Sequence, residues 1–245
     1  MANKIQQELE RAKEKTFKLI KGTNLVKLSK ENVAIVEAMI QNDSRYRKSG
    51  DKNAEPDKKK KYGGSTAYWM TQFKNLTGEK SDDYKTIILN LIKAIDKENS
   101  THLAVGDNLN QINKRICRLY EGGNLINSLK NADICIIEEI SKKTTGKEPR
   151  RNLSFASKFC HYACFYLFEG KKEQDNYSIY DNVVKNALPL YMKQYGVPAR
   201  DLDNYKEYKE AIDDIIMESK SEISRNGFDH LLWYYFKGRN LSYFK

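Results

Sequence analysis

The segment SFASKFCHYACFYLFEGKKEQDNYSIYDNVVKNAL holds residue types that are common in active sites. Ser154 and Lys158 are four positions apart, so on a helix they lie on one face, and Asp181 follows 23 residues after the lysine. Lysine can serve as a nucleophile, and aspartate as a general acid or base. A purely structural interpretation is also open, in which Lys158 extends its amine to water and Asp181 caps a helix. Spacing alone therefore identifies neither residue as catalytic.

Other chemistries that this segment suggests have weaker support. Cys160 and Cys164 share a helix face, but His161 points elsewhere and no second cysteine pair has a zinc-binding spacing. The two cysteines are instead expected to be small core residues. The three histidines, which include His102 and His230, lie in no nucleophile motif, and the chain has no glycine-rich phosphate loop. We therefore expect neither a metal nor another cofactor.

Helices are expected to position these side chains. Apolar residues recur at helical spacing over 152–168, and Asp181 stands between the apolar SIY and the helix-like NVVKNALPLYM, which is an N-cap position. NADICIIEEI could form a short strand, but its neighbours are helical and no second strand pairs with it, so we interpret it as helix. Further helices are predicted at 3–20, after Ser29, and at 66–77, 82–98, 107–120, 129–142, 179–194, 202–218 and 227–237. The sequence thus predicts an all-α fold.

The composition is that of a folded, basic protein. Of the 245 residues, 40% are hydrophobic and 11% aromatic, which excludes a disordered chain. Only 4 prolines and 13 glycines interrupt it, which favours long helices. The net charge of +10 and the pI near 9.2 favour a polyanionic partner, nucleic acid above all. The alternative is a lysine-rich proteome in which this charge is incidental.

Two segments concentrate the positive charge. Residues 45–65 hold eight basic and three acidic residues, so they are expected to form a solvated linker or a phosphate-binding arm. Residues 141–151 hold five basic residues and one acidic residue, and Gly146 and Pro149 favour a turn there. Such a turn ahead of a helix can grip a phosphate, or it can be an ordinary exposed loop. We predict three parts: an N-terminal helical segment at 1–44, a basic flexible loop at 45–65, and a helical domain of two lobes at 66–245.

No export signal or membrane span is visible. The N-terminal MANKIQQELERAKEK is charged, and no stretch of about 18 apolar residues occurs. The four cysteines, which include Cys117 and Cys135, are therefore expected to be reduced. We predict a cytoplasmic monomer without membrane association.

The pattern NLSFASKFCHYACFY…YSIYDNVVKNAL resembles the catalytic region of the helix-hairpin-helix DNA glycosylases, and most of all the bacterial 8-oxoguanine DNA glycosylase-like proteins. The ending GFDHLLWYYFKGRN is similar to the tail of those bacterial proteins, so the resemblance extends over residues 120–240. It implies a helical bundle in which a hairpin leads into the helix that carries a catalytic lysine. A later turn then supplies an aspartate at the head of the next helix.

Two features depart from the family pattern. The hairpin glycines are not clear in TTGKEPRRNLSF, and aligning Ala156 with the small residue after the usual lysine places Ser154 at the lysine position. Lys158 lies one helical turn later on the same face. The four-cysteine iron–sulfur loop of some members is absent, since no cysteine follows Cys164. The resemblance implies Lys158 and Asp181 as the catalytic pair.

The activity that the resemblance implies is excision of a damaged or modified base, such as 8-oxoguanine, from duplex DNA. The base is flipped out of the duplex, Asp181 stabilises positive charge on the sugar or activates the nucleophile, and Lys158 or water attacks C1′. Attack by Lys158 would give a Schiff base and AP lyase activity. The residues implied to contact the DNA are Lys142, Lys143, Lys147, Arg150, Arg151 and Ser154.

Two other functions stay open at this point. One is a non-catalytic nucleic-acid-binding protein on the same scaffold, in phage defence or regulation. The other is a helical protein-interaction module whose charge is incidental. The glycosylase hypothesis requires Asp181 to lie near Lys158 or Ser154 at a cleft.

Overall fold

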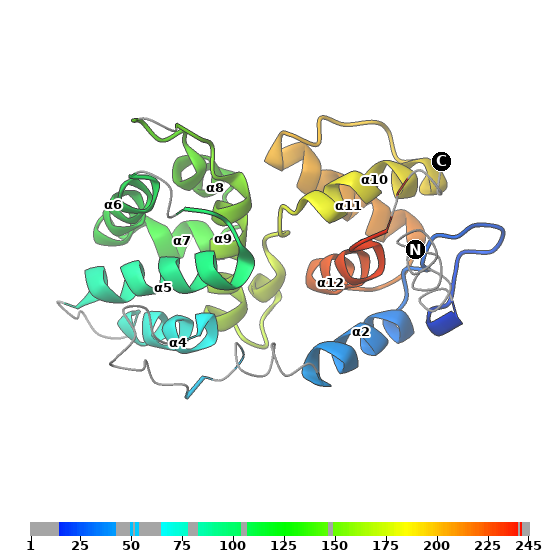
Figure 1. The fold of residues 1–245 in the computed structure, drawn as a ribbon, viewed down its shortest axis with the longest axis horizontal. Helices are drawn as coiled ribbons and strands as arrows, with labels where there is room; N and C mark the ends of the chain where they lie inside the picture. The colour runs from blue at the N-terminus through cyan, green and yellow to red at the C-terminus, as the bar shows by residue number, and fades with distance from the viewer. Residues whose placement is uncertain are drawn as a thin grey trace, which may run out of the picture. The chain divides into compact units, whose positions relative to one another are not determined.

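The fold is all-α, as the sequence predicts. The computed structural model contains ten α-helices and one 3-10 helix among the residues that it describes, and their only β structure is an isolated bridge between Leu19 and Val26 (Figure 1). In the same part of the chain, no helix is long and apolar enough to cross a membrane. The described residues are 15–42, 50, 52–53, 65–77, 83–103, 107–146, 149–239 and 241.

The chain forms two compact units, and the first of them is continuous in sequence. This central unit comprises residues 42–179. Its helix α9 contacts four other α-helices of the unit and its 3-10 helix, so a side chain on α9 has a well-defined environment. The elements of the central unit are α4 (Thr66–Leu76), α5 (Tyr84–Asn99), α6 (Asn108–Glu121), α7 (Asn124–Lys130), α8 (Ile134–Ser141), α9 (Leu153–Leu167) and the 3-10 helix η1 (Lys172–Asp175).

The second unit, the terminal unit, is assembled from both ends of the chain, residues 1–41 and 180–245. The Tyr191 hydroxyl donates to the Val26 carbonyl at 2.9 Å, and the Tyr235 hydroxyl donates to the Asn24 carbonyl at 2.7 Å. These bonds join the N-terminal segment to helices that come more than 150 positions later. The helices of the terminal unit are α2 (Lys30–Asn42), α10 (Asn182–Tyr195), α11 (Tyr205–Ser219) and α12 (Arg225–Phe236).

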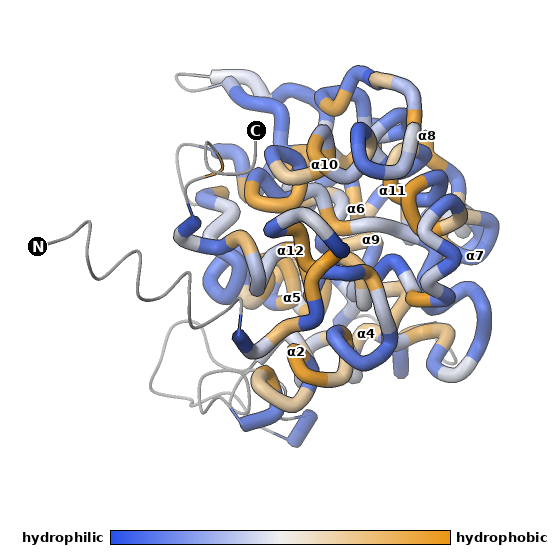
Figure 2. Tube along the Cα trace, turned by 90° about the vertical axis from the view of Figure 1, so that its right-hand side faces the viewer, coloured by the Kyte–Doolittle hydropathy of each residue, from blue (hydrophilic) through white to orange (hydrophobic). Residues whose placement is uncertain are grey.

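Each unit has its own hydrophobic core. In Figure 2 hydrophobic and hydrophilic stretches alternate along the helices, as expected when each helix buries one face. The central core includes the ring pair Phe73 and Phe159, whose centroids are 6.1 Å apart. The terminal core is rich in aromatic residues, and Tyr191 meets both Phe228 and Phe236 edge-on. Every one of these five rings is at most 2% exposed.

Local rules account for many of the helix starts. Ser65, Asp133, Asn204 and Ser224 each accept a backbone N–H of the following helix through a side-chain oxygen. Asp181 does the same for α10, so the predicted N-cap is confirmed. The interpretation of NADICIIEEI as helix is also confirmed, because α8 covers most of it.

Two helix boundaries were predicted wrongly. The helix expected at 129–142 is interrupted by a turn at Asn131–Asp133, where Ala132 has a φ of 54° that no continuous α-helix allows. Only α8 lies within that range, and most of α7, which begins at Asn124, was not predicted. The helix expected at 3–20 does not reach residue 20, since Leu19 pairs with Val26 instead. The rest of that expected helix, up to residue 14, lies outside the described residues, as does most of the predicted 45–65 loop.

Candidate active site

The loop before α9, residues 142–152, is fastened to α6 in its first part, residues 142–145. Arg115 on α6 donates to the carbonyl oxygens of Lys142 and Lys143, the latter at 3.2 Å. The Gln111 side chain donates to the Thr145 carbonyl and accepts the Thr145 N–H, each at 3.0 Å. Side chains of a neighbouring helix therefore fix the backbone of this first part of the α8–α9 loop, which carries Lys142 and Lys143.

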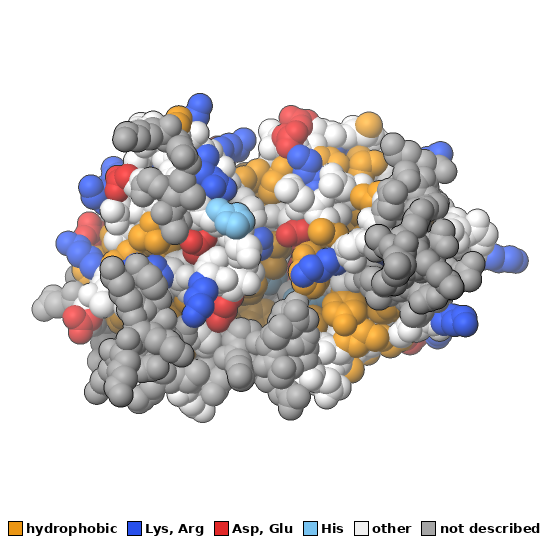
Figure 3. Space-filling model, in the orientation of Figure 1, with side chains coloured by type: hydrophobic (Ala, Val, Ile, Leu, Met, Phe, Trp, Pro, Cys, Tyr) orange, Lys and Arg blue, Asp and Glu red, His pale blue; other side chains and the backbone are white. Residues whose placement is uncertain are grey.

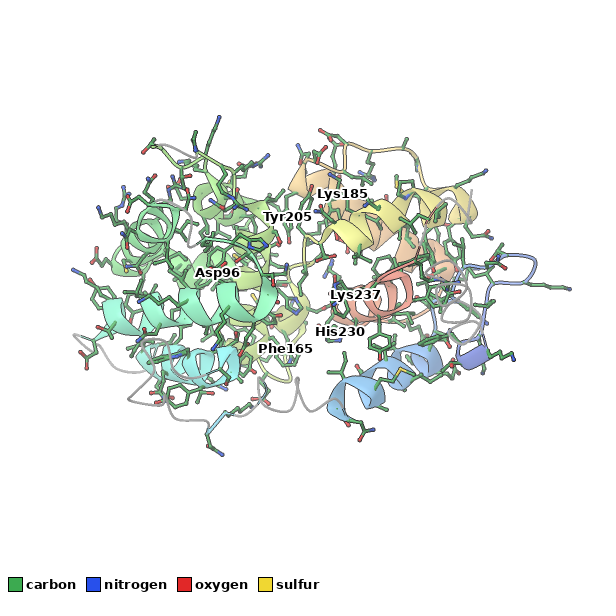
Figure 4. All side chains as sticks on the ribbon, viewed as in Figure 1. Asp96, Phe165, Lys185, Tyr205, His230 and Lys237 are labelled. Carbon is green, nitrogen blue, oxygen red and sulfur yellow. The ribbon has the colours of Figure 1, made fainter. Side chains whose placement is uncertain are left out.

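Arg150 points inward from this loop. Its guanidinium donates to the carbonyls of His102 at 3.0 Å and Thr101 at 3.3 Å. Asp96, at the end of α5 (Figure 4), holds the same short segment, because its Oδ1 accepts the Thr101 hydroxyl at 2.6 Å and the Leu103 N–H at 2.9 Å. His102 has a left-handed φ of 56°, which few side chains adopt. Arg150 and Asp96 thus fix a strained turn between α5 and α6.

Lys158 lies in a buried part of α9. Only 7% of the residue is exposed, and its Nζ donates to Ser154 Oγ at 2.9 Å. The prediction that these two side chains share a face is therefore confirmed. An amine that is removed from water and bonded to a hydroxyl can form Schiff bases, and it can also activate the serine, as in Ser–Lys hydrolases.

The neighbouring sulfur and imidazole groups belong to the core. Cys160 and Cys164 are fully buried, as predicted, and burial raises the pKa of each thiol. His161 is 2% exposed, and its Nδ1 lies 2.9 Å from the Tyr177 carbonyl oxygen. Among the described residues, no three His, Cys, Asp or Glu side chains are grouped as metal ligands. The contact with the Tyr177 carbonyl, just after η1, thus fixes the orientation of the His161 ring in the core.

Asp181 is held at the head of α10. Its Oδ1 accepts the Val183 N–H at 2.8 Å, and its carbonyl accepts the Lys185 N–H at 2.8 Å. The Tyr208 hydroxyl of α11 also makes a hydrogen bond with the backbone of Asp181. The carboxylate therefore sits at the N-terminal end of a helix, and its backbone is fixed by a second helix.

A polar cluster fixes the residue that precedes Asp181. The Tyr180 hydroxyl donates to Asp203 Oδ1 at 3.0 Å, and Lys185 (Figure 4) donates to the same oxygen. The hydrogen bond to Asp203, and then the one to Tyr180, raise the pKa of Lys185. Burial is the main cause that raises the pKa of Tyr180. Because Lys185 follows Asp181 by one helical turn, this cluster ties the start of α10 to the loop before α11.

Asp229 is a buried carboxylate of the terminal unit that acts on the same hydroxyl as Asp181 and that was not predicted from the sequence. It lies on α12 and is 7% exposed. Tyr208 is fully buried; burial raises the pKa of its hydroxyl well above the ordinary value, and the charge of Asp229 is the next largest cause. Asp181 also contributes to this shift, so both carboxylates act on one hydroxyl. The available signal was an acidic residue inside the apolar stretch GFDHLLWYYF.

The predicted DNA contacts divide into two groups. Lys142, Lys143 and Arg151 are exposed on the α8–α9 loop, and basic side chains gather at that end of the central unit in Figure 3. Arg150 is turned toward the backbone at Thr101 instead, and Lys147 lies outside the described residues. Three of the six implied contacts are thus displayed to solvent.

The predicted catalytic pair is divided between the two units. Ser154 and Lys158 belong to the central unit and lie together, whereas Asp181 belongs to the terminal unit. Each side chain is held firmly within its own unit. The pairing of Lys158 with Asp181 stays a prediction.

Comparison with known proteins gives one match. A family model described as HI_0787_N, N-terminal domain, matches residues 44–165, a range that lies inside the central unit. No curated protein and no solved structure matches the chain.

Proposed function

We propose that this protein is a DNA glycosylase that flips a damaged or modified base out of the duplex and removes it, with 8-oxoguanine as the first base to test. Lys158 is the proposed nucleophile and Asp181 the proposed stabiliser of positive charge on the sugar. The observation that carries the proposal is the placement of Lys158, which is buried on the helix that directly follows a basic loop. The resemblance of this sequence to the glycosylases also rests on α9.

Burial suits Lys158 to covalent catalysis. Removal from water disfavours a charged amine, and only the neutral amine is a nucleophile. In the proposed step the neutral amine attacks C1′, and the bond between C1′ and the base breaks. The base leaves with the bonding electron pair and takes up a proton. The attacking nitrogen then loses a proton, and its lone pair forms a double bond to C1′ as the C1′–O4′ bond breaks. The ring oxygen O4′ keeps that bonding pair and takes up a proton, which leaves a Schiff base between Lys158 and C1′.

Asp181 complements this chemistry by charge. The bond to the base breaks with positive charge developing on the sugar, and a fixed carboxylate lowers the energy of that state. The hydrogen bond from the Val183 N–H to the carboxylate, and the one between the Tyr208 hydroxyl and the Asp181 backbone, fix Asp181 before substrate binds. A group that is already oriented needs no reorganisation during the reaction.

The α8–α9 loop is the proposed grip on the DNA backbone. Lys142, Lys143 and Arg151 are exposed there, immediately before the helix that carries Lys158. Phosphate contacts of this kind set the position of a protein on the duplex and carry no base specificity. The excised base would be selected elsewhere, by the pocket into which it is flipped.

Borohydride trapping tests the proposal. The wild-type protein is incubated with duplexes that carry 8-oxoguanine, uracil or a modified cytosine, and adducts are separated by denaturing electrophoresis. We expect an adduct with wild type and none with Lys158→Ala. The matched control is Lys130→Ala, an exposed lysine at the end of α7 in the same unit, which should trap as wild type does.

Two outcomes would redirect the proposal. Base release that persists in Lys158→Ala but disappears in Asp181→Asn would assign water as the nucleophile. No base release from any of these duplexes, together with salt-dependent DNA binding, would favour a non-catalytic nucleic-acid-binding protein, which the exposed basic loop also supports.

A further inference from the structure

We propose that Ser154 is the positioning residue of Lys158, and that its hydroxyl orients the lysine amine rather than contacting DNA. This inference rests on the proposed function, in which Lys158 is the nucleophile. It also departs from the sequence-based expectation, which placed Ser154 among the DNA contacts.

The geometry of α9 carries the proposal. Lys158 Nζ donates to Ser154 Oγ at 2.9 Å, so the two side chains are joined across one helical turn. Ser154 itself lies in the first turn of α9, directly after the α8–α9 loop, and it is only partly buried. Lys158 is 7% exposed. Ser154 Oγ thus accepts a hydrogen bond from the Lys158 amine in the first turn of α9.

The contact matters because a lysine side chain is flexible. Four rotatable bonds separate its amine from the backbone, and each conformation that points away from C1′ is unproductive. A neutral amine has two N–H bonds and one lone pair. When one N–H is donated to Ser154, rotation about the last bond is fixed, and the lone pair is left to attack.

Ser157 provides a matched serine on the same helix. It is fully buried and lies beside Lys158 in sequence, and its hydroxyl donates to the Ser154 carbonyl at 3.1 Å rather than to the lysine. A substitution of Ser157 removes a hydroxyl from the same helical turn, and that hydroxyl is not the acceptor of the Lys158 bond, which is Ser154 Oγ. Comparison of the two serines therefore tests whether the hydroxyl of Ser154 in particular sets the trapping rate.

The experiment measures single-turnover trapping with sodium borohydride on an 8-oxoguanine duplex. Ser154→Ala is expected to lower the rate constant of adduct formation about tenfold, since a lost hydrogen bond of ordinary strength has that effect on a rate. The Kd for the duplex should stay at the wild-type value, and the Tm should fall by only about 2–4 °C, as the loss of one hydrogen bond implies. Ser154→Thr, which keeps the hydroxyl, should restore most of the rate, and Ser157→Ala should trap as wild type does.

The alternatives give different results. A wild-type trapping rate in Ser154→Ala overturns the inference and leaves the proposed function standing. Weaker duplex binding with an unchanged rate constant would also overturn it, because Ser154 would then be a DNA contact. A Ser154→Thr variant as slow as Ser154→Ala would mean that the hydroxyl has no part in the reaction. Absence of any adduct with wild type overturns the covalent mechanism and this inference with it.

Discussion

Asp181 caps α10 through one carboxylate oxygen and carries a charge that capping does not require. Asparagine caps a helix about as well as aspartate. Asp181→Asn should therefore keep the bond to the Val183 N–H, and the free energy of unfolding should change by less than about 0.5 kcal/mol. Base release should fall at least about a hundredfold, as when one charge-stabilising group is lost from an active site. Thermal unfolding and single-turnover excision measure the two effects.

A second N-cap in the terminal unit supplies the control. Asn204 caps α11 by accepting the Lys206 and Glu207 N–H groups. Asn204→Ala should cost about 1 kcal/mol of stability, as N-cap losses do, with excision unchanged. If Asp181→Asn excised bases at the wild-type rate, the aspartate would be only a cap.

At the scale of elements, the α8–α9 loop carries two kinds of basic residue. Arg150 is bonded to backbone carbonyls, whereas Lys143 is exposed to solvent. Arg150→Ala removes the donors to the Thr101 and His102 carbonyls, so we expect it to destabilise the protein by about 1–2 kcal/mol. Arg150→Lys should restore little of this, because one ammonium cannot reproduce a forked donor. The measurement is the free energy of unfolding in urea.

Lys143 in the same loop should show the opposite pattern. Its side chain is exposed, so Lys143→Ala should leave stability unchanged. If it contacts one phosphate, the slope of log K against log salt should fall by about 0.9 for duplex DNA. Titrations at several salt concentrations measure this slope. An unchanged slope would remove Lys143 from the DNA interface.

The contact between α11 and the start of α10 predicts alkaline sensitivity. Burial raises the pKa of Tyr208 well above its ordinary value in the folded protein, whereas the unfolded chain ionises near pH 10. The unfolded state therefore loses this proton first, and stability falls as pH rises above about 10, by up to about 1.4 kcal/mol per pH unit for this residue. Tyr208→Phe should have a flatter stability curve between pH 10 and 11.

Tyr208→Phe should also be less stable than the wild type at neutral pH, which provides an internal check. It loses the hydrogen bond with the Asp181 backbone, which is worth about 1 kcal/mol. The wild type should therefore lose its advantage over Tyr208→Phe progressively as the solution becomes alkaline. Parallel curves for the two proteins would show that Tyr208 does not titrate differently in the folded state.

These contacts also show how far sequence reasoning extends. Asp181 was identified as an N-cap because the signal lies within five residues of it. The bond from Tyr208 to Asp181, and the one from Arg150 to Thr101, join residues 27 and 49 positions apart, and no local pattern encodes such pairings. Asp229 was missed for the same reason, since its importance depends on what α12 packs against.

Helix boundaries were predicted wrongly where the backbone adopts a conformation that the residue types do not indicate. The apolar spacing of 129–142 is compatible with one helix, but the chain turns at Ala132 and starts again after the cap at Asp133. Asp133 is an N-cap type inside NADICIIEEI, so this start was readable, whereas the left-handed alanine was not. The all-α class was predictable because it requires only the periodicity of many segments together.

At the scale of the whole molecule, the positive charge is unequally shared. The central unit has 25 basic and 18 acidic residues, a net charge of +7, and the terminal unit has 18 and 15, a net charge of +3. A polyanion should therefore be attracted mainly to the central unit. The proposed grip on DNA and the proposed nucleophile both belong to this unit, whereas Asp181 belongs to the other.

The central unit is built from one continuous segment of the chain, whereas the terminal unit needs two separate segments. Residues 42–179 are contiguous and contain a complete core around Phe73 and Phe159, so this fragment should unfold cooperatively by itself. Residues 180–245 should not, because Tyr191 would lose its bond to Val26 and be left with a buried, unbonded hydroxyl. Adding a peptide of residues 1–41 should restore helical structure to that fragment. Circular dichroism during thermal unfolding tests both halves, and a cooperative transition for 180–245 alone would show that the N-terminal segment is dispensable.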